Sequence, residues 1–584
     1  MPTIKVEQAL LHSIMAAHGV KHEVSRLMDE LPLLGTDISR CDDKMLEIEI
    51  FPDRPDLLCG ETLAHAIRPF IYGSDAQPTL VVESGDISMD IDASLENVRP
   101  IILGAVVRGV NCGVDEEEKE NFIKAMMDHQ EKLHFALGRG RRKASIGVHD
   151  LATLSPPFRV ITVPADYSFI PLQMSKPMSI SEILTSHEKG VDYAHLLEGF
   201  THFPVIIDSN DKVLSFPPII NGDHTTITHS TNDFFIDVTG WDQRACECCL
   251  LLICLQLAAR GGKVESVKTN TWAGEQVDTP DGSAVIHEIP NELVVDILGH
   301  DFNDIQLAAA IGRMGGRFLG RQPDKEPAVA NKPDTMMAGH RLLLEMPRWR
   351  FDILHPIDLV EELAIGHGYE DLGSQMPQHP TSAHPRPDAI FFRRLRECLQ
   401  GLGLQQVQSL TLSNHRDQFD APRWQMEGEA TRIHNPITSE HTLMRQSILP
   451  GLLRLLSANR HHELPQRVYE SGICIRGHAN CNRAAWLCAE PVSSFASGRG
   501  MMQALLRDLG AVARGLEVEW QTMNENEGPW MAGRAAKIVI SGTQVAEMGE
   551  VDPMVADSFG LRVPMHGAEL DIDALRAVIP DPVT

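Results

Sequence analysis

The chain has 584 residues, of which 43% are hydrophobic and 23% are charged, as in an ordinary folded protein. This length is too great for one hydrophobic core, so we expect several domains. With 52 basic and 80 acidic residues the net charge is −28, which excludes a chain that binds nucleic acid over its whole surface but not one with a local basic patch.

The chain shows no sign of a targeting or membrane segment. It opens with MPTIKVEQ, which lacks the basic and apolar regions of a signal peptide. The longest apolar run, CCLLLICLQLAA at 248–259, is too short to span a bilayer. Its cysteines suggest either a metal site or buried thiols on a core helix, and the second is favoured because no C-x-x-C repeat or histidine accompanies them. We therefore expect a cytoplasmic protein without a membrane contact.

The first 90 residues predict an α+β domain. Residues 7–30 have a helical pattern, and LEIEI at 46–50 alternates apolar residues with glutamates, as a half-buried strand does. The prolines of FPDRPD at 51–56 then predict a rigid turn.

Residues 91–275 predict a larger α+β domain. ILGAVVRGV at 102–110 is typical of a strand, and NFIKAMMDHQEKLH at 121–134 of an amphipathic helix. The basic loop GRGRRK at 138–143 follows, and with Lys132 and His134 it could meet a phosphate or an RNA end, although a charge run is more often a solvated loop. His149–Asp150 is more often a satisfied turn than a catalytic pair.

Two extended segments of this domain could form a polar pocket. In DFFIDVTG at 233–240, Asp237 and Thr239 share one face of a strand while Ile236 and Val238 share the other. Ser215 lies upstream in LSFPPIIN at 214–221. A solvated strand face is the alternative interpretation.

Residues 276–375 predict a small, mainly helical domain with helices at 303–315 and 355–368. In the second helix Pro356 suits the first turn, and Asp358, Glu361 and Glu362 lie at i, i+3 and i+4 on one face. Asp352 lies just upstream. Four carboxylates without a lysine repel one another unless a cation lies between them, and oxygen ligands suit Mg²⁺; acidic residues that merely favour a helix N-terminus are the alternative.

The last domain is predicted at 386–584. Polar, proline-rich segments at 322–334 and 376–388 are typical of linkers. The second precedes a helix with Phe391, Leu395, Cys398 and Leu402 on one face, followed by a strand near residues 407–412. This pattern predicts a helix that leads into an antiparallel sheet.

Several catalytic motifs are missing from the sequence. It has no G-x-x-x-x-G-K-[ST] phosphate loop, its G-R-G at 498–500 lacks the third glycine of a dinucleotide site, and it has no G-x-S-x-G nucleophile elbow.

Taken in order along the chain, these segments resemble the phenylalanine–tRNA ligase beta subunit family of the archaeal and eukaryotic type. The segments that carry the resemblance are FPDRPDLL, QEKLH, GRGRRKASIGVHDL, LSFPPIING, IDVTG, RFDILHPIDLVEELAIGHGY, HNPITSEHTLMRQSILPGLL, NRHHELPQRVYESG and GEVDPMV. Each segment alone would be a weak signal, but their order along nearly the whole chain is specific.

The resemblance implies a multidomain α+β fold and two sites. It implies an editing-type domain at 91–275, a winged-helix-like magnesium-binding domain at 276–375 and a class II synthetase-like domain that has lost its active site at 386–584. Its editing pocket would include Ser215, Asp237 and Thr239, and its Mg²⁺ ligands would be Asp352, Asp358, Glu361 and Glu362.

The resemblance also implies a division of labour. A separate alpha subunit would attach phenylalanine to tRNA within an (αβ)₂ tetramer, and this chain would hydrolyse tyrosine wrongly attached to the tRNA. The alternative is a scaffold subunit whose editing site is inactive. Trp241, where a smaller residue is expected, puts the fine specificity of that pocket in question.

Overall fold

The computed structural model describes residues 2–323, 340–374, 382–525 and 527–579. It forms two compact units, Met1–Met376 and Pro377–Thr584, each described here by itself. Of the predicted linkers, residues 324–334 and 376–381 lie outside the described residues. The mixed α+β, multidomain fold predicted from the sequence is confirmed.

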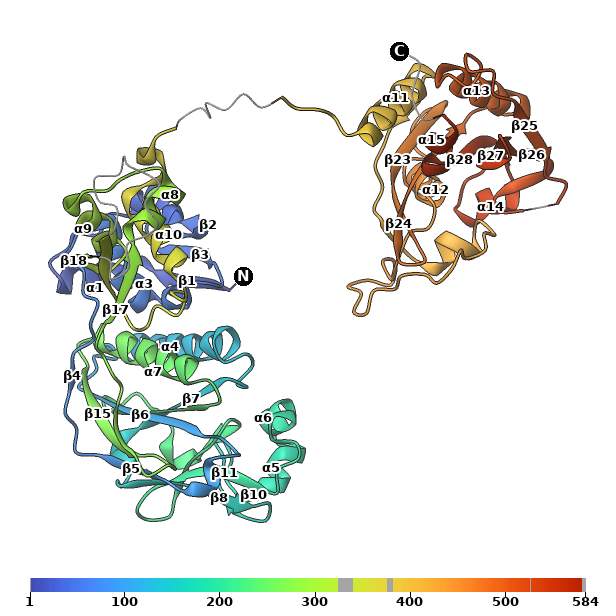
Figure 1. Ribbon diagram of the computed structural model, residues 1–584. Helices are drawn as coiled ribbons and strands as arrows, with labels where there is room; N and C mark the ends of the chain where they lie inside the picture. Colours follow the sequence, from blue (N-terminus) through green and yellow to red (C-terminus); the bar gives the residue numbers. More distant parts are fainter. Residues whose placement is uncertain (1, 324–339, 375–381, 526, 580–584) are drawn as a thin grey trace. The chain divides into compact units, whose positions relative to one another are not determined.

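The first 76 residues form a small antiparallel sheet covered by helices (Figure 1). Its strand order is β1-β3-β2, and the predicted alternation of β3 is confirmed because Leu46, Ile48 and Ile50 are fully buried. The predicted helical stretch is two helices rather than one. The elements are β1 (Thr3–Glu7), α1 (Gln8–Ala17), α2 (Val24–Glu30), β2 (Thr36–Cys41), β3 (Met45–Ile50) and α3 (Gly60–Tyr72).

The next domain is built on an 11-stranded sheet in which β14 (Phe234–Gly240) lies between β6 (Ile101–Arg108) and the end strand β7 (Ala144–Asp150). The helices α4 (Glu116–Ala136) and α7 (Gln243–Ala258) cover one face of these strands (Figure 1). The remaining elements are β4 (Val82–Glu83), β5 (Ser88–Ile91), β8 (Phe158–Pro164), β9 (Ser168–Phe169), β10 (Met178–Ser179), α5 (Ile180–Ser186), α6 (Glu188–Tyr193), β11 (His202–Ile207), β12 (Val213–Phe216), β13 (Ile220–Asn221), β15 (Lys263–Asn270) and β16 (Gln276–Thr279).

The third part of this unit packs three helices on a three-stranded antiparallel sheet of order β17-β19-β18. Both predicted helices are present, and α10 begins at Pro356 as expected. The elements are β17 (Val285–Pro290), α8 (Asn291–Leu298), α9 (Asp304–Arg313), β18 (Arg317–Pro323), β19 (His340–Met346) and α10 (Pro356–His367).

The second unit is a seven-stranded sheet of order β20-β23-β24-β28-β27-β26-β25, antiparallel except where β20 meets β23. The predicted opening helix is α11 (Pro387–Gly401). The other elements are β20 (Gln405–Gln406), β21 (Leu412–Ser413), β22 (Leu443–Met444), α12 (Leu449–Ala458), β23 (Gln466–Arg476), β24 (Ala479–Ala489), α13 (Phe495–Asp508), β25 (Val518–Thr522), β26 (Trp530–Ile540), β27 (Thr543–Val551), α14 (Pro553–Ser558), β28 (Met565–Asp571) and α15 (Ile572–Val578).

The strand predicted at 407–412 is mostly wrong. Only its last residue belongs to a strand, the two-residue β21. The backbone N–H of Ser409 donates to the Glu470 carboxylate at 3.0 Å, so a side chain takes the place of a neighbouring strand.

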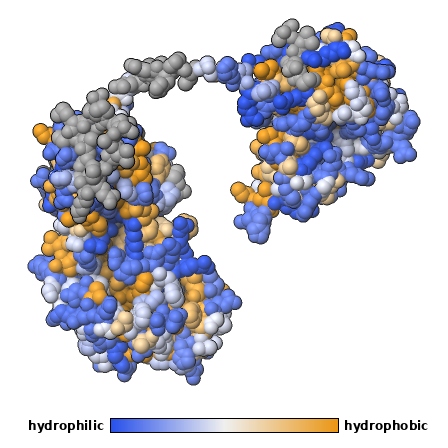
Figure 2. All heavy atoms as spheres, in the orientation of Figure 1, coloured by the Kyte–Doolittle hydropathy of each residue, from blue (hydrophilic) through white to orange (hydrophobic). Residues whose placement is uncertain are grey.

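On the face seen in Figure 2, hydrophobic residues are scattered among hydrophilic ones in both units. No helix in the described ranges is both long and apolar enough to cross a lipid bilayer.

Candidate functional site

Strand β14 presents the predicted polar pair on one face. Ile236 and Val238 lie in the core under α4 and α7, so Asp237 and Thr239 face the opposite way, as their alternation requires. Both polar side chains are nevertheless buried, with Asp237 1% and Thr239 0% exposed. This face is therefore an internal polar layer and not a solvated strand surface.

Asp237 is hydrogen-bonded to His149, which the sequence analysis had considered together with Asp150. Its Oδ2 lies 2.7 Å from His149 Nε2, and His149 Nδ1 lies 2.9 Å from Thr225 Oγ1. Asp150, the predicted partner of His149 in a turn, instead accepts a hydrogen bond from Thr231 Oγ1 at 2.7 Å. The pairing of His149 with Asp237 joins neighbouring strands and was missed because it spans 88 positions of sequence.

A glycine on β7 makes room for the Asp237 carboxylate. In the sheet register Asp237 lies opposite Gly104 on β6 and Gly147 on β7. A Cβ at Gly147 would lie 2.2 Å from Asp237 Oδ2. The close approach of the carboxylate to β7 therefore requires this small residue, whereas a Cβ at Gly104 would meet Val267 and Met89.

Thr239 is held by a buried arginine that the sequence analysis missed. Arg99 Nε donates to Thr239 Oγ1 at 2.8 Å, and Arg99 Nη2 donates to Ser145 Oγ at 3.0 Å and to the Thr239 carbonyl at 2.8 Å. Burial lowers the pKa of Arg99 to about 10, so the guanidinium stays charged at neutral pH. Arg99 belongs to none of the motifs found in the sequence, so no local pattern indicated its role.

Ser215 lies in the same region as Asp237 and Thr239 but is linked to them only indirectly. It sits on β12, buried, and its Oγ donates to Asn221 Oδ1 at 3.5 Å. Asn221 Nδ2 donates to the carbonyl of Val148, the neighbour of His149, at 3.4 Å. Within the described residues Ser215 has no direct hydrogen bond to Asp237 or Thr239, so the three predicted residues share a region and not a single contact.

The basic loop divides into exposed and buried members. Arg139, Arg142 and Lys143 are exposed, whereas Arg141 is buried and donates to the carbonyls of Pro218 and Ile219 at 3.2 and 3.0 Å. Arg141 thus clamps the LSFPPIIN segment and is unavailable to a phosphate.

The two other predicted phosphate contacts, both on α4, already have partners in the fold. His134 is buried and its Nε2 accepts from the backbone N–H of Ile146 at 2.8 Å, and burial lowers its pKa. Lys132 forms an ion pair with Asp128. Lys143 is exposed but pairs with Asp242 at 2.8 Å, so Arg139 and Arg142 are the members of this set that remain available to a phosphate.

Two of the four predicted metal ligands are paired with an arginine. Buried Arg350, two residues before Asp352, lies 2.5 Å from Asp352 Oδ2 and 2.7 Å from Glu362 Oε1. Asp358 Oδ2 accepts from the backbone N–H groups of Leu354 and His355 at 2.8 and 2.6 Å, as an acidic residue in a first helical turn does. The sequence argument required a cation among these carboxylates and overlooked that Arg350 supplies one.

Carboxylate oxygens are suitable ligands for a hard divalent cation, but these four carboxylates are not arranged as a preformed coordination site. Glu362 Oε2 is buried without a hydrogen-bond partner, and Glu361 is exposed. Burial, followed by the nearby charges of Glu362 and Asp53, raises the pKa of Glu361. Across the described part of the chain, no three Asp, Glu, His or Cys side chains are grouped closely enough to hold a metal ion as they stand.

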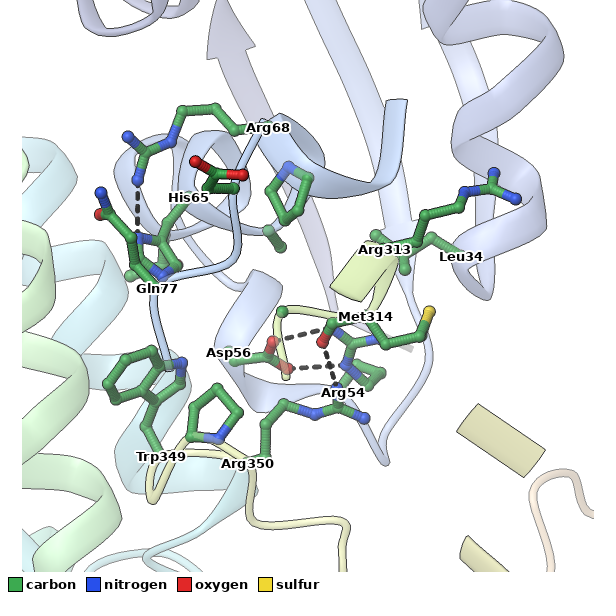
Figure 3. Close-up of a pocket in the computed structure, with 16 residues that line it drawn as sticks. Leu34, Arg54, Asp56, His65, Arg68, Gln77, Arg313, Met314, Trp349 and Arg350 are labelled. Carbon is green, nitrogen blue, oxygen red and sulfur yellow. Dashed lines mark hydrogen bonds and ion pairs between the residues drawn. The ribbon is translucent and has the colours of Figure 1, made fainter. Parts of the chain in front are cut away.

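The FPDRPD turn extends this charged cluster toward the N-terminal sheet. Arg54 donates to both oxygens of Asp56 at 2.8 Å, and both residues are buried. Figure 3 shows this pair beside Arg350 at a small hollow. The FPDRPD turn and the segment WRFD at 349–352 therefore each contribute buried charged side chains to this region.

The cysteine-rich helix α7 has the properties of a core helix. Cys246, Cys248, Cys249 and Cys254 are free and buried, and burial raises the pKa of each thiol, that of Cys246 to about 12. These thiols are therefore protonated at neutral pH and poor metal ligands.

Comparison with known proteins gives matches along most of the chain. Residues 113–247 match the B3/4 domain, residues 288–369 the tRNA synthetase B5 domain, and residues 372–572 the phenylalanyl tRNA synthetase beta chain CLM domain. The chain is 35% identical over 575 residues to the phenylalanine–tRNA ligase beta subunit of Methanothrix thermoacetophila, covering 98% of this chain and 100% of the relative. It is 34% identical over 572 residues to that of Methanococcoides burtonii, with the same coverage of 98% and 100%.

A solved structure is also similar. The N-terminal fragment of the phenylalanyl-tRNA synthetase beta subunit from Pyrococcus horikoshii matches with a TM-score of 0.54 and 28% identity, over 63% of this chain and 100% of the fragment.

Proposed function

The chain belongs to the family of phenylalanine–tRNA ligase beta subunits, and from this premise we propose that it supports the ATP-dependent attachment of phenylalanine to tRNA by a separate alpha chain. The observation that carries the proposal is the match to archaeal beta subunits over 98% of this chain and the full length of the relative. It would function in the cytoplasm as part of an (αβ)₂ tetramer.

The second unit would hold the alpha chain and not perform the aminoacylation itself. We propose that it is a class II synthetase-like domain without a working site, because the closing segment GAELDIDALRAVIPDPVT lacks the G-x-G-x-x-x-R-like element that places an arginine on ATP phosphates. Large apolar side chains exposed on this unit, including Leu410, Ile437, Val492 and Met554, provide area for a partner chain to cover.

Proofreading of tyrosyl-tRNA would take place around β14. A pocket that accepts phenylalanine rejects tyrosine weakly, whereas a second site that hydrogen-bonds the extra hydroxyl sorts the two far better. Asp237 would accept that hydrogen bond or orient the attacking water, while His149 holds its carboxylate in position. Thr239 and Ser215 would line the same region, and the exposed basic loop would meet the RNA.

Asp352, Asp358, Glu361 and Glu362 would hold Mg²⁺ in a winged-helix-like domain. Support comes from the chemistry of the donor set and from the buried, unpartnered Glu362 Oε2. When bound, the ion would supply positive charge to the cluster and stabilise its packing. The role is structural, because the cluster is separate from the polar layer on β14.

A scaffold subunit with an inactive editing site is the second candidate. It is favoured by one observation: Asp237 and Thr239 are fully buried and their side chains are engaged by His149, Arg99 and Ser145. Editing requires tyrosine to displace part of this network.

Deacylation of tyrosyl-tRNA by the assembled complex separates the two candidates. Asp237→Ala and Asp237→Asn should each lower the rate on the order of 100-fold, the usual loss for a missing polar catalytic group. Asp211→Asn serves as the control, because Asp211 is an exposed carboxylate of the same domain. Equal rates in wild type and in both Asp237 variants would favour the scaffold.

Phenylalanine charging with and without an alpha chain tests the division of labour. We expect activity only from the mixture. Formation of phenylalanyl-adenylate by this chain alone would overturn the proposed function.

A further inference from the structure

A buried guanidinium lies near the C-terminal end of α3 without a carboxylate partner. Arg68 is 7% exposed, and its Nη2 donates to His65 Nδ1 at 2.9 Å (Figure 3). Its Nε has no hydrogen-bond partner, and no ion pair joins it to a carboxylate anywhere in the described ranges. A buried charge without compensation is costly, so this arrangement favours a bound counter-ion.

The titratable neighbours of Arg68 do not compensate its charge. Burial, followed by the charge of Arg68, lowers the pKa of His65 to about 4, so the imidazole is neutral at pH 7 and accepts the hydrogen bond. Glu61 on the same helix lies 2.6 Å from Arg260 and is already paired. Asp75 lines the same hollow but is exposed and forms no ion pair with Arg68.

Two hollows meet at this guanidinium. Arg68, His65 and Gln77 line both a small hollow of about 30 Å³ and a larger one of about 260 Å³ that extends to Leu80 and Lys263. A water molecule occupies about 30 Å³ in the liquid, so the larger hollow has room for a small ion with its hydration.

Two guanidinium groups that line the smaller hollow, those of Arg68 and Arg313, form no ion pair within the described residues. Arg54 and Arg350 also line it, but Arg54 is paired with Asp56, and Arg350 is paired with Asp352 and Glu362. Arg313 donates to the carbonyls of Phe70 and Gly366 at 3.2 and 2.9 Å and so brings a second guanidinium that is held by carbonyls and not by a carboxylate.

We propose that the larger hollow binds a small oxyanion, of the phosphate or carboxylate class, with Arg68 as the principal donor. A guanidinium presents its N–H groups in a planar fork that matches such oxygens, and burial strengthens these charge-assisted hydrogen bonds. The site lies between α3, the segment before β4 and the strand β15, so a bound anion fastens the N-terminal sheet to the larger domain.

Thermal unfolding of the full chain in sodium phosphate or sodium acetate, each compared with sodium chloride at equal ionic strength, tests the proposal. A ligand that binds only the folded state raises its stability in a saturable way. We expect such a rise in wild type with at least one oxyanion, and the anion that produces it identifies the class. Arg68→Met should weaken the affinity at least tenfold, and Arg142→Met, which removes an exposed arginine, should leave it unchanged.

One further measurement keeps the test decisive. Without added oxyanion, Arg68→Met should be at least as stable as wild type, because it removes an unpaired buried charge. The proposal is overturned if wild type shows no saturable rise beyond that in chloride, or if Arg68→Met retains this rise.

Discussion

Arg350 provides the sharpest test of how the charged cluster stabilises the first unit. Its side chain is 2% exposed and joins Asp352 and Glu362, whose side chains are 12% and 6% exposed. Replacing it in Arg350→Met leaves two carboxylates without their cation in a buried place. Removing one partner of a buried ion pair typically costs about 3–5 kcal/mol, so we expect a loss of that size in the free energy of unfolding.

Urea unfolding of the full chain followed by circular dichroism measures this loss, and hydrogen exchange of the α10 amides localises it. Arg348→Met is a matched control, because Arg348 lies in the same segment but is partly exposed and pairs with Asp281. That variant should lose no more than about 1 kcal/mol. Equal losses in the two variants would refute the idea that the buried cluster holds this part of the chain together.

Magnesium gives the same experiment a second readout. If Asp352, Asp358, Glu361 and Glu362 form a Mg²⁺ site, the ion should restore part of the stability lost in Arg350→Met, since Asp352 and Glu362 then lack a cation. The loss should remain complete in EDTA. A loss that is the same with and without Mg²⁺ would count against the proposed metal site and leave the ion-pair reasoning intact.

Three other predictions concern the first unit. Gly147→Ala should destabilise the chain by about 1–3 kcal/mol and impair deacylation, because its Cβ would lie 2.2 Å from Asp237 Oδ2; unfolding and activity assays check both, and a fully active variant would contradict the fit. Burial, with a smaller contribution from His12, lowers the pKa of His22 from 6.5 to about 4, so the unfolded chain binds more protons between these values. The free energy of unfolding should therefore fall on the order of 1 kcal/mol from pH 7 to pH 5 through this group, and His22→Gln should flatten that dependence. Cys249 and Cys254 should resist iodoacetamide until the chain unfolds, because burial raises the pKa of both thiols; rapid labelling of the folded chain, seen by mass spectrometry, would contradict this.

Local periodicity predicted the elements well wherever apolar and polar residues alternate or a helix begins with proline. The alternation in LEIEI and in DFFIDVTG matched β3 and β14, and the proline at the start of α10 marked its first turn. The strand expected near residues 407–412 failed because the backbone N–H of Ser409 is satisfied by the Glu470 side chain, a contact that no local pattern encodes.

The site was predicted less completely, because its partners are distant in sequence. The Asp237 face was found from a period of two, but its partner His149 lies 88 positions away and the Arg99 that holds Thr239 lies 140 positions away. Arg350 is a different case. It stands only two residues before Asp352, and counting lysines alone as possible cations left it out of the charge balance.

One signal in the sequence could have indicated where the buried carboxylate lies. Gly147 lies in the middle of a strand, and a glycine inside a strand marks the close approach of another group. In the sheet it lies opposite Asp237, and a Cβ added to it would lie 2.2 Å from Asp237 Oδ2. An acidic residue in one strand and a glycine in the middle of another therefore predict a buried carboxylate beside that glycine, and a larger residue at Gly147 would force the carboxylate out of its place.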